Sequence, residues 1–416
     1  MREENAMTAL NDAPLWIPDS ERVADANMTR FMRWLAQARG VRCVDYAALH
    51  DWSVREREAF WPALWDYLQV RASVRGEAVL IDGDRMPGAC WFPEARLNYA
   101  ENILRHCSPG DDGDALRFRG EDKVRRCLSR GRLLGEVSRF ARALRGMGVE
   151  KGDRVAGYLP NMPEAIVAML ACAAIGAVWS SASPDFGVRG VVDRFGQIEP
   201  KLLLCADGYW YNGKRIDSLA RVAEIARALP SVARVVVIDY TRDDADIAAI
   251  RSAVRYEAFL APYASAPIDF VQLPFDHPLA ILYSSGTTGV PKCIVHAHGG
   301  VLLQHLKELV LHTDVKPGDR LFYFTTCGWM MWNWLASGLG AGATLLLYDG
   351  SPFIDGGRVL WDYAEAEGMT HFGTSAKYLD ALAKSGLKPR ESHRLDALRV
   401  MLSTGSPLAP ESFEFV

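Results

Sequence analysis

The sequence predicts an α/β fold, a large lobe built from parallel βαβ subdomains, and three observations lead to it. From about residue 126 onward, amphipathic segments with helical spacing alternate with short apolar runs, which is typical of parallel βαβ units. The chain has 416 residues, more than one ordinary core holds, so two or three packed subdomains are expected. Hydrophobic residues make up 49% of the chain and charged residues 24%, which indicates a globular protein.

Residues 1–110 are predicted to form a mainly helical, aromatic-rich region. Tryptophan is frequent there, and Met28, Phe31, Met32 and Leu35 recur at helical spacing. Aromatic stripes of this kind usually pack in a core, so we assign them to packing and not to a cofactor site.

Residues 111–416 are predicted to carry the βαβ units. Gly148 suits the C-cap of the first helix, and Pro163 suits the first turn of the second. Residues 239–274, with mixed charge and frequent Ala and Pro, are expected to connect two subdomains, and a second βα series runs from residue 279 to the end. The expected elements of the first series are a helix at 133–144, a strand at 154–159, a helix from 163, a strand at 177–179, a helix at 188–198, a strand at 202–205, a helix at 219–229 and a strand at 235–238.

Charge and cysteine usage exclude several classes of protein. The formal net charge of -4 gives no electrostatic basis for binding nucleic acid. The cysteines are scattered without a C-x-x-C pair, so they are expected to be reduced thiols. Arg2, Glu3 and Glu4 stand where a signal peptide is apolar, and no run of about 18 apolar residues is present to span a bilayer. The sequence therefore predicts a cytoplasmic protein without a membrane partner.

The stretch at residues 279–292 is the most informative one, because an apolar strand runs directly into hydroxyls, glycines and a lysine. Its glycines permit close backbone approach, so that amide N–H groups can point at an anion. The Walker pattern is not met, since Val290 and Pro291 separate Gly289 from Lys292. A plain Ser/Gly/Thr turn between strands is the alternative interpretation. The residues assigned to binding the phosphates of ATP are Ser284, Ser285, Gly286, Thr287, Thr288, Gly289 and Lys292.

This string resembles the phosphate loop of the adenylate-forming family, which comprises acyl-CoA synthetases, luciferases and peptide-synthetase adenylation domains. The resemblance implies that residues 111–416 form an AMP-binding domain. It also implies that the protein joins a carboxylate to AMP from ATP and then passes the acyl group to the CoA thiol. In that reaction Thr287 and Lys292 are expected to act catalytically, together with Mg²⁺, on the departing pyrophosphate.

A second segment matches the acyl site of this family. Residues 325–334 follow an apolar strand, and the family has a Gly-Trp element at this place. The resemblance therefore assigns Cys327, Gly328, Trp329 and Met330 to the acyl pocket. An aromatic helix start packed in the core is the alternative interpretation.

A third segment, residues 398–408, resembles the adenine-binding element. It assigns Gly405, Ser406 and Pro407 to the adenine, although Ser406 stands where the family usually has Glu. A carboxylate role at that position is therefore not expected.

The CoA nucleotide is expected at a basic glycine turn. Lys214 and Arg215 stand where short-chain members of the family bind this nucleotide, whose phosphates need cationic side chains. A solvated surface turn is the alternative interpretation.

No metal site is identifiable from the sequence. His296 and His298 share a face if both lie on a strand, but no Cys or carboxylate stands nearby to complete a tetrahedral zinc site. Residues 184–187 mimic the kinase Asp-Phe-Gly triplet without its partner motifs, and are expected to form a helix-entry turn.

Several strings together resemble the acetoacetyl-CoA synthetase branch of the family, which implies an acid–thiol ligase with acetoacetate, ATP and CoA as substrates. Because family members continue well past residue 416, the small C-terminal domain and the Mg²⁺ ligand are expected to be absent, and activity to be impaired or lost. A non-catalytic nucleotide-binding fragment and a ligase for another short-chain carboxylate are the alternatives. The strings that carry the resemblance lie at 14–18, 27–35, 91–102, 295–300 and 328–334.

Overall fold

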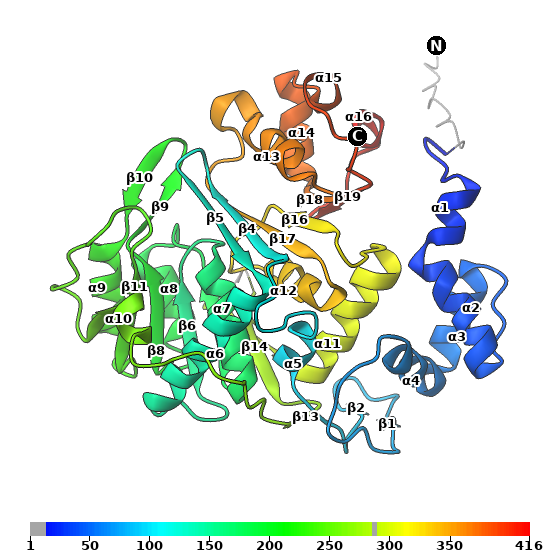
Figure 1. Cartoon of the computed structure of the whole chain (residues 1–416), viewed down its shortest axis with the longest axis horizontal. Helices are drawn as coiled ribbons and strands as arrows, with labels where there is room; N and C mark the ends of the chain where they lie inside the picture. Colours follow the sequence, from blue (N-terminus) through cyan, green and yellow to red (C-terminus); the bar gives the residue numbers. More distant parts are fainter. Residues whose placement is uncertain (1–13, 285–288) are drawn as a thin grey trace, which may run out of the picture.

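A computed structural model of the chain describes residues 14–284 and 289–416. Two mixed β-sheets and the helices that cover them confirm the predicted α/β class (Figure 1). Both sheets are mainly parallel, and each ends in one antiparallel edge strand.

The larger sheet has seven strands and is parallel except at β15, which pairs antiparallel with β14. Its inner strands at Leu202–Ala206 and Arg234–Ile238 are apolar and almost entirely buried, as expected where helices cover both faces of a parallel sheet. In spatial order they are β12 (Ala253–Arg255), β11 (Arg234–Ile238), β8 (Leu202–Ala206), β6 (Arg154–Tyr158), β7 (Val178–Ala182), β14 (Pro278–Tyr283) and β15 (Cys293–Ala297).

The smaller sheet has six strands and joins distant parts of the chain, because the hairpin β4–β5 precedes the first helix of the larger sheet while the other strands follow residue 319. β4 pairs parallel with β17 and antiparallel with β5. In spatial order the strands are β19 (Val400–Thr404), β18 (His371–Ser375), β16 (Arg320–Tyr323), β17 (Thr344–Asp349), β4 (Asp114–Gly120) and β5 (Val124–Ser129).

The helices that pack on the two sheets have either an amphipathic or a fully apolar sequence, as expected. Pro163 begins α7 as predicted, whereas the C-cap of α6 is Met147 and the predicted Gly148 follows it with φ +83°. In chain order the helices are α6 (Arg130–Gly146), α7 (Pro163–Ile175), α8 (Val188–Phe195), α9 (Leu219–Ala228), α10 (Tyr256–Leu260), α11 (His298–Lys307), η1 (Glu308–His312), α12 (Met330–Ser337), η2 (Gly338–Ala341), η3 (Ile354–Gly357), α13 (Val359–Glu367), α14 (Ala376–Ser385), α15 (Pro389–Ser392) and α16 (Pro410–Phe415).

The described part of the N-terminal region, residues 14–110, consists of helices and a few two-residue strands. Phe31 and Leu35, part of the predicted apolar stripe, are buried on α2. Figure 1 shows its first helices at one side of the molecule. Its elements are α1 (Ser20–Asp25), α2 (Asn27–Arg39), α3 (Tyr46–Arg55), α4 (Arg57–Tyr67), β1 (Leu80–Ile81), β2 (Cys90–Trp91), β3 (Arg96–Leu97) and α5 (Tyr99–Ile103).

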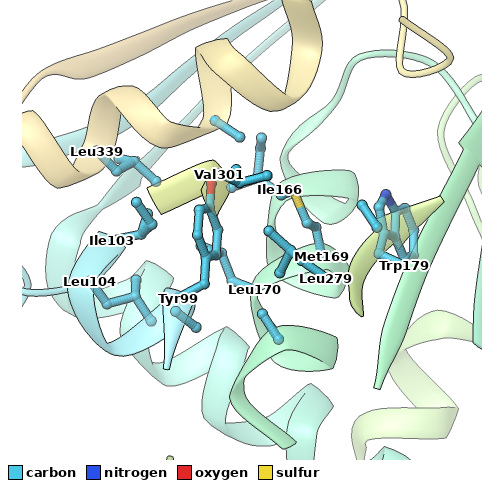
Figure 2. Packing of buried hydrophobic residues seen from close by; sticks show 14 of the residues in the cluster. Tyr99, Ile103, Leu104, Ile166, Met169, Leu170, Trp179, Leu279, Val301 and Leu339 are labelled. Atoms are coloured by element: carbon cyan, nitrogen blue, oxygen red, sulfur yellow. The ribbon is translucent and has the colours of Figure 1, made fainter. Parts of the chain in front are cut away.

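The largest core cluster surrounds α7, which packs against both α5 and α6. Every residue of α7 except Glu164 is buried, which explains why this helix is apolar on all sides. Figure 2 shows Leu170 and Met169 of α7 between Tyr99 of α5 and Trp179 of β7. The N-terminal region and both sheets therefore share one continuous core.

The prediction that residues 239–274 connect two subdomains is wrong. This segment contributes β12 to the larger sheet, α10, and β13 (Leu273–Pro274), and β14 then returns to the same sheet beside β7. The division into sheets depends on long-range strand pairing, which local composition does not report.

Two properties of the whole chain bear on its class. All eight cysteines are free, as predicted. Within the described ranges, no helix combines the length and the apolar character needed to cross a bilayer.

Candidate functional site

The predicted phosphate loop lies between β14 and β15 at the carboxyl edge of the larger sheet, where parallel sheets commonly bind ligands. Its base is closed by two hydrogen bonds: the Ser284 amide donates to the Lys292 carbonyl at 3.0 Å, and the Lys292 amide donates to Ser284 Oγ at 3.1 Å. Lys292 itself is exposed, and Gly289 has φ +149°, a conformation that side-chain-bearing residues rarely adopt. Of the predicted residues, Ser285, Gly286, Thr287 and Thr288 lie outside the described residues.

Gln197, which the sequence did not single out, braces the base of this loop. Its Nε2 donates to the Pro291 carbonyl at 2.8 Å, and its Oε1 accepts a bond from Cys293 Sγ at 3.7 Å. Because Gln197 follows α8, these contacts fix the loop to a neighbouring helix. No local pattern at Gln197 indicates this role.

A cleft of about 750 Å³ is lined by β15, the strand that follows the loop. The edge strand β15 and the edge strand β19 both line it, so the two sheets meet there. Apolar groups of α11 and α12 form much of its wall. The residues that line it are Val295, His296, Ala297, Gly300, Val301, Gln304, His305, Glu308, Thr313, Tyr323, Met330, Met331, Trp334, Leu402, Ser403 and Thr404.

The predicted acyl residues separate into two groups. Met330 lines the cleft, whereas the Trp329 side chain is 57% exposed and does not contribute to the lining. Cys327 is buried: its Sγ donates to the Pro160 carbonyl at 3.2 Å, and its own carbonyl accepts from Ser181 Oγ at 2.7 Å. Burial also raises the pKa of this thiol well above its usual value. Cys327 therefore anchors the segment and does not form the cleft wall.

Gly328 lies against the larger sheet, and a Cβ built on it would come 3.7 Å from the Ser183 amide nitrogen. Other residues of the segment 325–334 pack in the core, as the alternative interpretation of this segment states. Trp332 and Trp334 are buried, and Trp332 Nε1 donates to Asn161 Oδ1 at 2.9 Å. The segment 325–334 thus combines core residues with cleft residues.

The predicted adenine residues follow β19 directly. Ser403 and Thr404 at the end of this strand line the cleft, and Gly405 has a left-handed φ of +94°. Ser406 and Pro407 are exposed beyond the turn and do not belong to the cleft lining.

Lys214 and Arg215 lie on β10 (Lys214–Asp217), which forms a hairpin with β9 (Gly208–Tyr211) outside the cleft. Both side chains are exposed. Asn212 and Gly213 make the turn with left-handed φ values of +54° and +75°. This geometry agrees with the basic turn that the sequence predicts, and a ligand role for it stays a prediction.

Glu121 holds this hairpin in place, a role that the sequence did not reveal. Its carboxylate accepts from the amides of Asn212 at 2.6 Å, Gly213 at 2.7 Å and Ser351 at 2.9 Å. The residue is fully buried at the end of β4. Since β4 belongs to the smaller sheet, Glu121 ties the hairpin to that sheet.

The two histidines considered for a metal do not lie on one strand. His296 is on β15, whereas His298 is the first residue of α11 and accepts a bond from the Tyr99 amide at 3.3 Å through Nδ1. In residues 14–284 and 289–416, no three His, Cys, Asp or Glu side chains are grouped so that they could hold a metal ion. Residues 184–187 precede α8, with Gly187 as its N-cap, as the predicted helix-entry turn requires.

Family models match most of the chain. One described as "AMP-binding enzyme" matches residues 112–416, and one described as "Acetyl-coenzyme A synthetase N-terminus" matches residues 46–103.

Individual proteins with acetoacetyl-CoA synthetase names are also similar to the chain. The one from Rhizobium meliloti (strain 1021) is 56% identical over 406 residues, which cover 97% of this chain and 62% of the relative. The one from Rattus norvegicus is 46% identical over 411 residues, which cover 97% of this chain and 60% of the relative. The solved acetoacetyl-CoA synthetase from Streptomyces lividans matches with a TM-score of 0.91 at 47% identity, covering 97% of this chain and 62% of that one. The chain thus spans about three fifths of the length of these relatives.

Proposed function

Since the chain belongs to the AMP-binding enzyme family, we propose that it ligates acetoacetate to CoA through an acyl-adenylate. In the first step a carboxylate oxygen of acetoacetate attacks the α-phosphorus of ATP, and pyrophosphate leaves. In the second step the CoA thiolate attacks the acyl carbon, AMP leaves, and acetoacetyl-CoA forms. The adenylate is needed because a free carboxylate lacks a good leaving group.

This proposal is supported by a cleft that two predicted segments, and the strand that follows the third, line together. β15 begins directly after Lys292, Met330 belongs to the acyl segment, and Thr404 immediately precedes the adenine turn. Residues of β15, Met330 and Thr404 all line the same 750 Å³ cleft. The acyl and adenine segments thus share one cleft, and Lys292 precedes a strand that lines it, which supports binding of ATP next to the acid, as adenylate formation requires.

Charges support a division of the site between phosphate and acyl ends. Lys292 supplies an exposed ammonium at the mouth of the loop, where it stabilises charge on the departing pyrophosphate. Burial lowers the pKa of His296, and it lowers that of His305 to about 3, so both imidazoles are neutral near pH 7. Apart from Glu308, the residues that line the cleft are consequently neutral or apolar, which suits a short acid.

Mg²⁺ would accompany ATP and neutralise phosphate charge. Among the residues that line the cleft, Glu308 is the single carboxylate, and its Oε1 lies 2.8 Å from Lys307 Nζ. This donor set does not fit a dedicated protein site for Mg²⁺, so no step of the proposal is assigned to the ion.

Isotope exchange between ATP and pyrophosphate tests the first step without CoA. Exchange that depends on acetoacetate, and is weaker with acetate or propionate at equal concentration, is the expected result. Faster exchange with acetate or propionate would assign the site to another short-chain acid. Bound ATP without exchange for any of these acids would leave a nucleotide-binding protein and overturn the proposal.

A further inference from the structure

His305 is a polar group on the cleft wall that none of the predicted motifs includes. It lies on α11, is 6% exposed, and lines the cleft with the apolar side chains of Val301 and Trp334. Its Nδ1 is 2.8 Å from Ser337 Oγ at the end of α12. The contacts of that hydroxyl decide which ring nitrogen carries the proton.

Ser337 has one hydroxyl hydrogen but makes three short contacts. Its Oγ lies 3.0 Å from the Asn333 carbonyl oxygen, 2.6 Å from the Tyr99 hydroxyl and 2.8 Å from His305 Nδ1. A carbonyl has no hydrogen to give, so all three are hydrogen bonds only if Ser337 donates to Asn333. Tyr99 and His305 must then both donate to Ser337 Oγ. This arrangement places the hydrogen on Nδ1 and leaves a lone pair on Nε2.

Burial keeps this tautomer neutral. It lowers the pKa of His305 to about 3, and the nearby His296 adds a smaller effect in the same direction. His305 lines the cleft, and because Nδ1 is bonded to Ser337, Nε2 is the ring nitrogen that remains for a ligand there. Nε2 has no hydrogen-bond partner in the described part of the chain, so it offers a vacant acceptor to whatever occupies the cleft.

We propose that His305 selects the substituent at C3 of the acyl ligand, by accepting a hydrogen bond at Nε2. This inference rests on the proposed function, because it assumes that an acid occupies the cleft. Hydroxyl or amide groups at C3 donate to Nε2 directly. A 3-oxo group has only lone pairs, so a water molecule donates one hydrogen to Nε2 and the other to the oxo oxygen. An acid with plain methylene at C3 leaves Nε2 without a partner.

Two measurements test the inference, and the first does not depend on activity. The ¹⁵N resonances of the His305 ring are expected to show a protonated Nδ1 and an unprotonated Nε2 between pH 5 and 8. A protonated Nε2 would overturn the inference and leave the proposed function standing.

The second measurement compares the dissociation constants of butyrate, 3-hydroxybutyrate and malonamate by titration calorimetry with ATP present. We expect 3-hydroxybutyrate and malonamate to bind about tenfold more tightly than butyrate, as one hydrogen bond provides. His305→Leu should abolish this preference. Ser337→Ala allows the ring to carry its hydrogen on Nε2, so this variant should show a smaller preference. Tyr99→Phe leaves the Ser337–His305 bond intact and should preserve the preference.

The binding results distinguish a failure of the His305 role from a failure of the proposed acyl site. Equal binding of all three acids to the unaltered chain would overturn the role of His305 alone. Binding of none of them would overturn both the acyl site and this inference.

Discussion

Lys292 is the residue whose charge the proposed chemistry uses most directly. A hydrogen bond from an ammonium to phosphate contributes about 1.5–3 kcal/mol, so Lys292→Ala is expected to raise the dissociation constant of ATP by about tenfold or more. Calorimetric titration with ATP measures this change. Lys384→Ala, at an exposed lysine on α14 paired with Asp380, is the matched control and should leave ATP affinity unaltered. Equal affinity in all three proteins would contradict the assignment of the loop.

Asp349 is a buried carboxyl with an unusual pH response. Its Oδ2 accepts from the Tyr240 hydroxyl at 2.8 Å and from the Trp210 amide at 3.3 Å, yet burial raises its pKa to about 7. Between about pH 4 and 7 the native state therefore binds a proton that the unfolded state, with a pKa near 3.9, has released. This group stabilises the fold at low pH, and that contribution falls as the pH rises through the window.

Asp349→Asn should remove this pH dependence. The free energy of unfolding of the variant, relative to that of the unaltered chain, is expected to rise by at most about 1.4 kcal/mol per pH unit as the pH is raised from 5 to 7. The melting temperature of the variant should rise relative to that of the unaltered chain over the same range. Melting curves at several pH values measure the difference. Asp380→Asn, at a carboxyl that is 55% exposed, is the control. Parallel plots of melting temperature against pH for the unaltered chain and Asp349→Asn would contradict this role of Asp349.

At the scale of elements, α7 is the helix on which the largest core cluster depends. Leu170 is fully buried within it, so Leu170→Ala should lower the free energy of unfolding by about 3 kcal/mol through lost burial and a residual cavity. Urea denaturation gives the value. Leu15→Ala, at a side chain that is 69% exposed, should change it by less than about 0.5 kcal/mol. A similar loss for both variants would show that burial does not determine the result.

The hairpin β9–β10 depends on Glu121 in a different way. Glutamine at this position replaces an acceptor oxygen by an N–H₂ group that faces backbone donors, so Glu121→Gln should free the turn. We expect about tenfold faster amide exchange at Asn212 and Gly213, together with weaker CoA binding if Lys214 and Arg215 contact its phosphates. Hydrogen–deuterium exchange and a CoA titration measure the two effects. Asp122→Asn, at the exposed neighbouring carboxylate, is the control, and unaltered exchange at the turn in Glu121→Gln would refute the tether.

At the scale of the whole molecule, both sheets line the cleft and share one core. Binding of ATP there should stabilise the described lobe as a unit, by about 2.7 kcal/mol when ATP is present at a hundred times its dissociation constant. Differential scanning calorimetry should show a single transition that moves to higher temperature with ATP. Two transitions, of which ATP shifts one, would mean that the sheets unfold independently.

The parts of the fold that follow from short-range chemistry could be predicted. Helical spacing located α2 and α6, and apolar runs located β6, β8 and β11 within one or two residues. Pro163 marked the start of α7 because its missing amide hydrogen is not needed in a first helical turn. The glycines, hydroxyls and lysine of the predicted phosphate loop occur consecutively between two strands, so the loop could be proposed from the sequence, and its binding role stays a prediction.

Groups brought together by folding could not be predicted. Gln197 and Pro291 lie 94 positions apart, and Glu121 and Asn212 lie 91 apart, so no local periodicity connects them. Cys327 shows the same limit: its place in the motif favoured the acyl pocket, whereas the folded chain turns its thiol toward Pro160.

By itself, the sequence determined the α/β class and most strands and helices, and it predicts a phosphate loop, since these depend on neighbours within a few positions. The tertiary structure alone decided that β4 and β5 join the sheet of β16–β19, that β14 returns beside β7, and that His305 meets Ser337. Such pairings are selected by the burial of whole surfaces and by hydrogen bonds between distant segments, so their energy belongs to no single stretch of chain.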